Sequence, residues 1–140
     1  MIDPTYVSEL RVRYAETDKA GIVYYANYLV YMEAARSEML IAHGLPYSVI
    51  EARGIQLPVR EVYCKYNAPA FFEDILQVKV KIAKFTAVTC KIIYEIVRKD
   101  TQELLAEGFT VHPFIGDDNK LVRAPNFFKD IFIEEAKERG

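Results

Sequence analysis

The chain has 140 residues, which suits one domain with a buried core, so we expect a single domain over residues 1–140. Its composition, 51% hydrophobic and 27% charged, is ordinary for a globular protein and argues against disorder. A formal net charge of -2 argues against nucleic acid or a membrane surface as the main partner.

The N-terminal residues 1–10 carry Asp3 and Glu9 and lack the basic start and apolar run of a signal peptide. No stretch is apolar and long enough to span a bilayer. Cys64 and Cys90 fall in strand-like apolar runs without the spacing of a metal site, so both are expected to be buried thiols. These features predict a cytoplasmic protein with no membrane insertion and no metal.

The first element is a strand over residues 6–14, because its side chains alternate between two faces. One face holds Tyr6, Leu10, Val12 and Tyr14, and the other holds Glu9, Arg11 and Arg13. The next segment, residues 15–27, breaks this period and contains Asp18 and Gly21, which predicts a loop.

Residues 27–43 predict a helix, because they lack Gly and Pro and are rich in Ala, Leu, Met, Glu and Arg. Asn27 is the expected N-cap, and Gly44 followed by Pro46 is the expected stop. Apolar side chains cover most of the circumference, which indicates a buried helix. In so short a chain, a curved sheet is the economical structure to wrap it.

The rest of the chain is mostly strand. We expect strands over residues 55–66, 76–82, 86–98 and 104–114, a hairpin turn at 99–102, a turn at 116–119 and a terminal helix at 126–139 with Phe127, Phe128, Ile131 and Phe132 as its apolar stripe. This order predicts an α+β fold with an antiparallel sheet of about five strands. Its exposed edges favour a homodimer with a continuous sheet.

The segment from Glu16 to Tyr28 is the main candidate for chemistry, because it places a carboxylate just ahead of a helix. A helix N-terminus offers unpaired N–H groups and partial positive charge, which can hold an oxyanion. Asp18 is a candidate general base or nucleophile. From pattern alone, the stronger interpretation is that Asp18 caps a turn that Gly21 completes. The sequence lacks a Gly-rich phosphate loop, a G-x-S-x-G elbow and an H-E-x-x-H motif.

The run from Val12 to Tyr28 resembles the signature of hotdog-fold thioesterases, in the branch that contains 4-hydroxybenzoyl-CoA thioesterase and the Tol–Pal-associated acyl-CoA thioesterases. The segments 31–40, 58–59 and 66–74 also resemble that family. The resemblance implies a hotdog fold, a long central helix wrapped by a curved antiparallel sheet, in a dimer at least and a tetramer by analogy.

The resemblance also implies roles for single residues. Asp18 matches the catalytic carboxylate, as nucleophile or as base on water, and Tyr25 matches the residue whose backbone N–H contacts the thioester carbonyl. Some relatives have His where Tyr25 stands, so a side-chain acid at this position is in doubt. Gly21, Val23 and Tyr24 match the segment that binds substrate. Other hotdog thioesterases use a helix Glu, for which Glu33 is the candidate, although pairing with Arg36 or Ser37 is the simpler interpretation.

Four further side chains carry weaker hypotheses. Lys84 and Arg123 are turn-adjacent cations that could bind the phosphate-rich end of coenzyme A, in this chain or from a partner, although solvated surface charge is the simpler interpretation. His43 at the helix C-terminus and His112 on a strand have no Ser or Cys partner in local sequence.

These features together predict an enzyme that hydrolyses acyl-CoA thioesters without a cofactor. Three different functions remain open beside it. One is a hydrolase of aromatic acyl-CoA, such as hydroxybenzoyl- or dihydroxynaphthoyl-CoA, within the same fold. Another is a dehydratase acting on acyl carriers, which would use a His near the helix. The third is a non-catalytic protein that binds acyl-CoA or acts as a scaffold.

Overall fold

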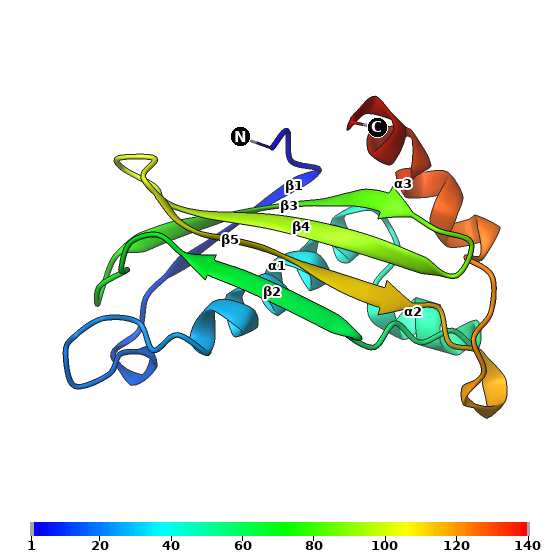
Figure 1. Cartoon of the computed structure of the whole chain (residues 1–140), viewed down its shortest axis with the longest axis horizontal. Coiled ribbons are helices and arrows are strands. Elements are labelled where there is room, and N and C mark those ends of the chain that lie inside the picture. The colour runs from blue at the N-terminus through cyan, green and yellow to red at the C-terminus, as the bar shows by residue number, and fades with distance from the viewer. Residues whose placement is uncertain (1, 140) are drawn as a thin grey trace.

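The computed structural model describes residues 2–139, in which one long helix lies across a curved five-stranded sheet (Figure 1). The strands are β1 (Tyr6–Arg11), β2 (Glu61–Tyr66), β3 (Ile75–Phe85), β4 (Thr89–Arg98) and β5 (Leu104–Pro113). The helices are α1 (Asn27–Ala42), α2 (Tyr47–Ala52) and α3 (Asn126–Arg139), with short 3₁₀ turns at Tyr14–Glu16 and Asp117–Asn119.

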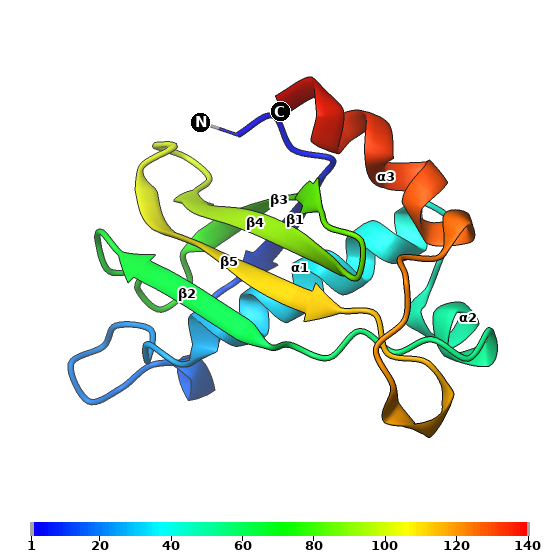
Figure 2. The same cartoon turned by 45° about the vertical axis from the view of Figure 1, so that its right-hand side comes forward.

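The strands follow the spatial order β1-β3-β4-β5-β2, and every neighbouring pair is antiparallel. The meander β3-β4-β5 forms the middle of the sheet, while β1 and β2 are added at its two edges. Figure 2 shows α1 running beneath this sheet. The predicted α+β class and the predicted sheet of about five antiparallel strands are confirmed.

Packing of α1 on the concave face of the sheet makes the core. The helix buries Tyr28, Tyr31, Met32, Ala35, Met39 and Leu40. The prediction of burial all round is wrong for the single chain, because Leu29, Val30 and Ile41 are exposed, Ile41 by 61%. The exposed stripe of α1 is therefore mostly apolar, although Glu33 and Ser37 also lie on it, whereas the exposed face of a surface helix is usually polar.

The predicted boundaries of the first strand and of the strand before β3 need correction. β1 ends at Arg11, and Tyr14 lies in a 3₁₀ turn with 76% of its surface exposed. The expected strand over residues 55–66 begins only at Glu61, and the short helix α2 precedes it. Apolar and polar side chains alternate imperfectly in this segment, so the sequence does not mark where the strand begins.

The end of the sheet where β3 stops is closed by phenylalanines from three segments of the chain. Phe85, Phe114, Phe128 and Phe132 pack against one another, mostly edge-on or tilted, with ring centroids 5.1 to 6.4 Å apart. Of the expected stripe of α3, Phe128 and Phe132 are buried, whereas Ile131 is exposed. Among the described residues, no helix is long and apolar enough to cross a membrane.

Both cysteines lie in the sheet, but only Cys90 is buried as expected. Cys90 is fully buried, and burial raises the pKa of its thiol to about 12. Cys64 is half-buried, and burial likewise raises the pKa of its thiol, despite a hydrogen bond with Tyr66 that lowers it. Both thiols are therefore protonated and weakly reactive at neutral pH.

Candidate active site

The carboxylate of Glu16 organises the loop between β1 and α1. Its oxygens accept hydrogen bonds from the Arg13 N–H (2.9 Å), the Arg13 guanidinium (3.0 Å) and the Tyr31 hydroxyl (2.9 Å). Its backbone oxygen accepts from the Tyr24 N–H (2.8 Å) and the Asn27 side-chain amide (2.9 Å). One residue thus joins the loop to the first turns of α1.

Electrostatics agree with this role for Glu16. Desolvation raises the pKa of its carboxyl, but the hydrogen bonds from the Arg13 N–H, Tyr31 and the Arg13 guanidinium outweigh it, so the pKa is lowered. Tyr31 responds in the opposite direction, because burial and its bond to Glu16 raise the pKa of its hydroxyl. The carboxylate is therefore ionised and the phenol neutral across the physiological range.

Asp18 lies at the tip of this loop, exposed to solvent. Its Oδ1 accepts the Ala20 N–H (2.8 Å), and Gly21, with φ at 82°, donates its N–H to the Asp18 carbonyl (3.0 Å). The turn-capping interpretation of Asp18 and Gly21 is thus what the single chain shows. Within residues 2–139, Oδ2 accepts no hydrogen bond, so half of the carboxylate is still available.

The start of α1 presents unpaired N–H groups. Among the described residues, the backbone N–H groups of Tyr25 and Ala26 find no acceptor, while the Tyr25 carbonyl accepts from the Tyr66 hydroxyl (3.0 Å). The expected N-cap is wrong: Ala26 occupies that position, and the Asn27 side chain bonds to Glu16 instead. A helix start without a side-chain cap leaves its donors to a ligand or to water.

A cavity of about 300 Å³ adjoins Tyr25, between the loop, the start of α1 and the end of β2. Its lining is mostly apolar and aromatic, with Ile22, Val23, Tyr25, Tyr28, Tyr66, Asn67, Ala68 and Pro69. Tyr66 stands edge-on to Tyr28 (5.1 Å) and to Tyr25 (6.3 Å). Burial, followed by a hydrogen bond with Cys64, raises the pKa of Tyr66 to about 12. This phenol is therefore a neutral hydrogen-bond donor.

Comparison with known proteins identifies this arrangement. Residues 12–132 match the model of the thioesterase-like superfamily. The chain belongs to that superfamily. The thioesterase fold and enzyme class expected from the sequence are thereby confirmed, and the protein is a thioester hydrolase.

Individual members of the superfamily cover most of the chain. YbgC of Escherichia coli, named an acyl-CoA thioester hydrolase, is 32% identical over 91 residues, 65% of this chain and 68% of its own. A DHNA-CoA thioesterase structure from Staphylococcus aureus is 31% identical with a TM-score of 0.82, covering 96% of this chain and 89% of its own. A 1,4-dihydroxy-2-naphthoyl-CoA thioesterase structure from Synechocystis is 27% identical with a TM-score of 0.85, covering 92% and 96%.

Within this thioesterase, the expected site residues divide into two groups. Val23 and Tyr25 line the cavity, and Asp18, Gly21 and Tyr24 belong to the same loop. The structure does not bring the two expected cations there. Lys84 lies near the end of β3, and Arg123 precedes Ala124, whose N–H bonds to the Ala87 carbonyl at that same end. In one chain, both cations therefore lie at the opposite end of the sheet from Tyr25.

Glu33 is one of the residues that line a second groove, about 250 Å³ in volume, between α1 and β2. The ion pair expected with Arg36 does not form within the described residues. The Arg36 guanidinium instead approaches the Tyr94 hydroxyl (3.5 Å). Glu33 is thus two turns of helix beyond Tyr25, too far along α1 to share its cavity.

The two histidines form contacts within the fold, away from the candidate site. His43 Nδ1 approaches the Met39 carbonyl (2.8 Å), and its ring packs on Phe132. His112 is buried, with Nδ1 near the Leu57 carbonyl (3.1 Å) and Nε2 near the Thr110 hydroxyl (2.8 Å). Desolvation lowers the pKa of His112 to about 4, against the opposing effect of the Leu57 carbonyl. It is therefore neutral at pH 7, with Nδ1 as the donor and Nε2 as the acceptor.

Sequence reasoning missed two residues that shape the site, Glu16 and Tyr66. Glu16 stands three residues after Arg13, and this spacing of an acidic residue after a turn start was the available local signal. Tyr66 had no such signal, because its bond to Tyr25 joins residues that are 41 positions apart.

Proposed function

We propose that the protein hydrolyses acyl-CoA thioesters at the N-terminus of α1, with the Tyr25 N–H polarising the thioester carbonyl and Asp18 acting as general base on water or as nucleophile. The observation that carries this proposal is the unpaired N–H of Tyr25 beside a mostly apolar cavity. A donor fixed by the backbone needs no rearrangement as negative charge develops on the carbonyl oxygen. The positive end of the helix dipole adds to the same effect.

The reaction balances without a cofactor. Water attacks the carbonyl carbon as Asp18 takes its proton, a C–O bond forms, and the electron pair of the broken C–S bond leaves on the CoA sulfur. The proton then passes to that thiolate. In the alternative route, Asp18 attacks directly, and water hydrolyses the resulting anhydride. Both routes use the carboxylate oxygen that the Ala20 turn leaves available.

The test is thiol release from a panel of acyl-CoAs, with wild type and Asp18→Asn measured side by side. Asn keeps the acceptor for the Ala20 N–H, so the turn survives while the charge is lost. We expect turnover to fall by about 100-fold or more. Asp130→Asn, which removes an exposed carboxylate on α3, is the control and keeps wild-type turnover. Wild-type activity in Asp18→Asn would overturn the role of Asp18.

An aromatic acyl group is the second candidate, and the three tyrosine rings of the cavity favour it. Their edge-to-face geometry suits an aromatic guest. The solved relatives from Staphylococcus aureus and Synechocystis are also named for dihydroxynaphthoyl-CoA or its abbreviation. The same panel separates the two candidates, since kcat/KM for benzoyl- or naphthoyl-CoA exceeds that for aliphatic chains only under the aromatic hypothesis.

A dehydratase and a non-catalytic binder make different predictions. A dehydratase would need a His near the start of α1, and the described residues place both histidines elsewhere. A non-catalytic binder would hold acyl-CoA without releasing thiol, and Asp18→Asn would not change its affinity. The cytoplasmic location expected from the sequence stays a prediction.

We further infer that the protein acts as a homodimer joined along β2, which is a free edge of the sheet. The N–H of Asn67 bonds to the Leu105 carbonyl, so by alternation the odd-numbered residues of β2 face β5. The N–H and C=O groups of Val62, Cys64 and Tyr66 therefore point outward, where the described residues supply no strand. A second copy satisfies these groups by antiparallel pairing.

Charge favours one register for this pairing. If the two-fold axis of the dimer passes through Tyr63, Glu61 lies opposite the partner's Lys65. Symmetry repeats this contact, so the interface holds two pairs of opposite charge. Opposite charges across two strands stabilise by roughly 0.2–1 kcal/mol each. An axis through Cys64 loses both pairs, and an axis through Glu61 or Lys65 sets like charges against each other.

Oxidative cross-linking separates the registers. Tyr63→Cys combined with Cys64→Ser places two thiols at a close-approach pair, about 4.5 Å between Cα atoms, and should form a disulfide dimer. Oxidised wild type should stay unlinked, because Cys64 faces Val62 of the partner subunit. A disulfide dimer of wild type, with no disulfide in the double variant, would instead place the two-fold axis at Cys64. Light scattering would report whether the dimer assembles further into the tetramer that the resemblance implies.

This dimer also brings one of the two distant cations, Lys84 of the partner subunit, closer to the site. Four residues that pair in turn form a row across the sheet from β2 to β3: Glu61, Val111, Lys91 and Lys84. When two copies pair about Tyr63, the partner's row lies next to Tyr66 of this chain. The partner's Lys84 would then bind the phosphate end of CoA. Lys84→Ala should raise KM about tenfold for acyl-CoA but not for a thioester of a short thiol without phosphates. An equal effect on both thioesters would remove Lys84 from the site.

A further inference from the structure

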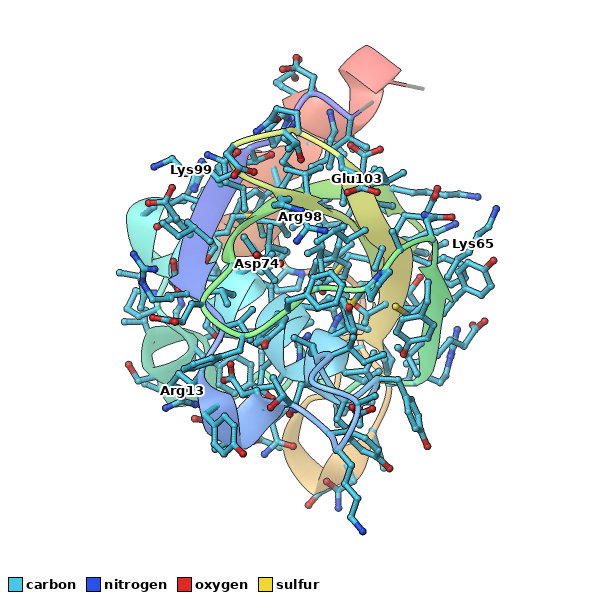
Figure 3. All side chains as sticks on the ribbon, turned by 90° about the vertical axis from the view of Figure 1, so that its left-hand side faces the viewer. Arg13, Lys65, Asp74, Arg98, Lys99 and Glu103 are labelled. Atoms are coloured by element: carbon cyan, nitrogen blue, oxygen red, sulfur yellow. The ribbon has the colours of Figure 1, made fainter. Side chains whose placement is uncertain are left out.

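Arg98, at the end of β4, holds the loop that forms one wall of the cavity. Figure 3 looks onto this end of the molecule, where Arg98 lies between Asp74 and Glu103. Its guanidinium forms an ion pair with Asp74, donates to the Pro69 carbonyl (3.1 Å) and contacts the Glu103 carboxylate (3.3 Å). The Arg98 side chain is only 15% exposed, so its bond to Asp74 is partly shielded from bulk water, whereas its bonds to Pro69 and Glu103 lie at the surface.

The loop over residues 67–74 is folded around the same ion pair. Asp74 Oδ2 also accepts the Phe71 N–H (2.8 Å), and the Phe71 carbonyl accepts the Asp74 N–H (3.0 Å). Glu73 adopts a φ of 70°, a left-handed conformation that non-glycine residues rarely take. A turn that contains such a residue depends on contacts from outside. Arg98 supplies those to Asp74 and Pro69, while Arg11 and Val12 bond to the backbone of Glu73.

The inner side of this loop touches the catalytic segment. The Ala70 carbonyl accepts the Val23 N–H (2.9 Å), and the Ala70 N–H donates to the Tyr28 hydroxyl (3.3 Å). Ile22 forms an isolated bridge with Phe71. Val23 and Pro69 line the cavity, and Tyr25 follows two residues after Val23. Arg98 is thus separated from the segment that carries the Tyr25 N–H by one short loop.

We propose that Arg98 is a positioning residue for thioester hydrolysis, which holds the 67–74 loop against Val23 and thereby fixes the cavity wall and the Tyr25 N–H. The proposal rests on the proposed function for its effect on turnover. Arg98 touches no reacting atom and acts through Pro69 and Ala70. The rate depends on it because a displacement of about 1 Å in a positioned donor costs up to 100-fold in rate.

The geometry requires a guanidinium and not only a positive charge. Two nitrogens of Arg98 bond to separate groups, Nη1 to Asp74 and Nη2 to the Pro69 carbonyl. A lysine ammonium on a single stem cannot span both with the planar fork of arginine. The neighbouring Lys99 provides a natural comparison, since it forms a single ion pair within the described residues, with Glu9 (2.7 Å), and is half exposed.

The first measurement is amide hydrogen exchange of Arg98→Met, with Lys99→Met as the matched loss of a neighbouring charge. We expect the Val23 amide, and the Ala70 amide with it, to exchange about tenfold faster or more in Arg98→Met, with amides in the middle of β3 unchanged. Lys99→Met should leave both loops protected. Because this readout does not involve catalysis, it tests the positioning step even if the proposed reaction is wrong.

The second measurement is turnover. We expect kcat of Arg98→Met to fall about 10- to 100-fold with a smaller change in KM, Arg98→Lys to fall less, and Lys99→Met to match wild type. A cavity of about 370 Å³ opens beside Arg98, lined in part by Arg11, Asp74 and Lys99. Millimolar guanidinium should therefore partly restore the turnover of Arg98→Ala and have no effect on Lys99→Ala.

If the Arg98 variants do not fold, Asp74→Asn replaces them, since it keeps an acceptor for the Phe71 N–H and removes only the charge. Unchanged exchange at Val23 in a folded Arg98→Met or Asp74→Asn variant would overturn the proposal. Faster exchange with wild-type kcat would also overturn it, since the loop would then move without affecting the reaction.

Discussion

Aromatic side chains gather at both ends of the sheet, but they do different work at each end. At the closed end, Phe85, Phe114, Phe128 and Phe132 pack against one another, and three of them are fully buried. At the open end, tyrosines surround the cavity, and Tyr25 is 61% exposed. Phenylalanine contributes buried area alone, whereas tyrosine adds a hydroxyl that can bond to the backbone.

At the open end, tyrosine hydroxyls form hydrogen bonds that connect separate segments of the chain, and each such bond is called a strut below. Tyr66 bonds to the Tyr25 carbonyl, Tyr28 accepts the Ala70 N–H, and Tyr31 bonds to Glu16. Each strut joins two segments that belong to different elements. The closed end is thus held by packing and the open end by hydrogen bonds. The open end can therefore keep a cavity and exposed donors without collapsing.

Replacing a phenylalanine by alanine at each end should give the largest difference between the two ends, measured as the loss of unfolding free energy. Phe132→Ala removes a fully buried ring and should lower the free energy of unfolding by about 3–5 kcal/mol. Phe72→Ala, at the open end, removes a half-exposed ring and should cost about 1 kcal/mol or less. Urea unfolding measures both. Equal losses would mean that the open end is also held by packing.

Acidification should destabilise the two ends in different pH ranges. His112, which lines the same small pocket as Phe128, has a pKa near 4 when folded and near 6.5 when unfolded, so the unfolded chain binds its proton first. Stability should therefore fall from about pH 6.5 to pH 4, by at most about 3 kcal/mol. The lowered pKa of Glu16 keeps its contribution above about pH 4.5 and loses it as the pH falls further.

Two variants separate these pH ranges. The pH dependence of stability above pH 4 should vanish in His112→Gln. The pH dependence of stability below pH 4 should weaken in Glu16→Gln. Urea midpoints measured between pH 3 and pH 7 would show each. Retention of the full slope in His112→Gln would assign that slope to other groups.

The smallest expected effect concerns a single strut. Tyr66→Phe loses the hydrogen bond to the Tyr25 carbonyl and should lower the free energy of unfolding by about 1 kcal/mol. Tyr63→Phe, on the opposite face of β2, is the control. We also expect kcat of Tyr66→Phe to fall several-fold while Tyr63→Phe stays near wild type. Identical kcat values would show that Tyr66 supports the strand and not the Tyr25 N–H.

The elements that the sequence predicts best are those whose signals are local. Gly44 and Pro46 mark the end of α1, and alternation marks β3 and β4, because these patterns depend on neighbours within one turn or one strand. The predicted start of β2 is wrong because alternation there is imperfect. The predicted N-cap is wrong because Asn27 bonds to Glu16 across the loop, and no local rule reports such a contact.

The candidate site shows the same division between local and distant contacts. The loop of Asp18 and the donor at Tyr25 are recognised by resemblance in one continuous run of sequence. The ion pair of Arg98 with Asp74 is not, since its partners are 24 residues apart and come from different parts of the chain. The exposed stripe of α1 escapes prediction for another reason: its apolar pattern reports burial without saying whether this chain or a second copy provides it.

The topology of β1 has a consequence for biosynthesis. Tyr6 pairs with Val80, so the first strand must wait for a segment made much later in translation. The meander of β3, β4 and β5 closes through short connections and can assemble by itself, whereas β1 and β2 must dock onto finished edges. Closing so long a span is entropically slow. The loop that carries Asp18 thus leaves the ribosome well before β3 and is among the last segments of the domain to take its final shape.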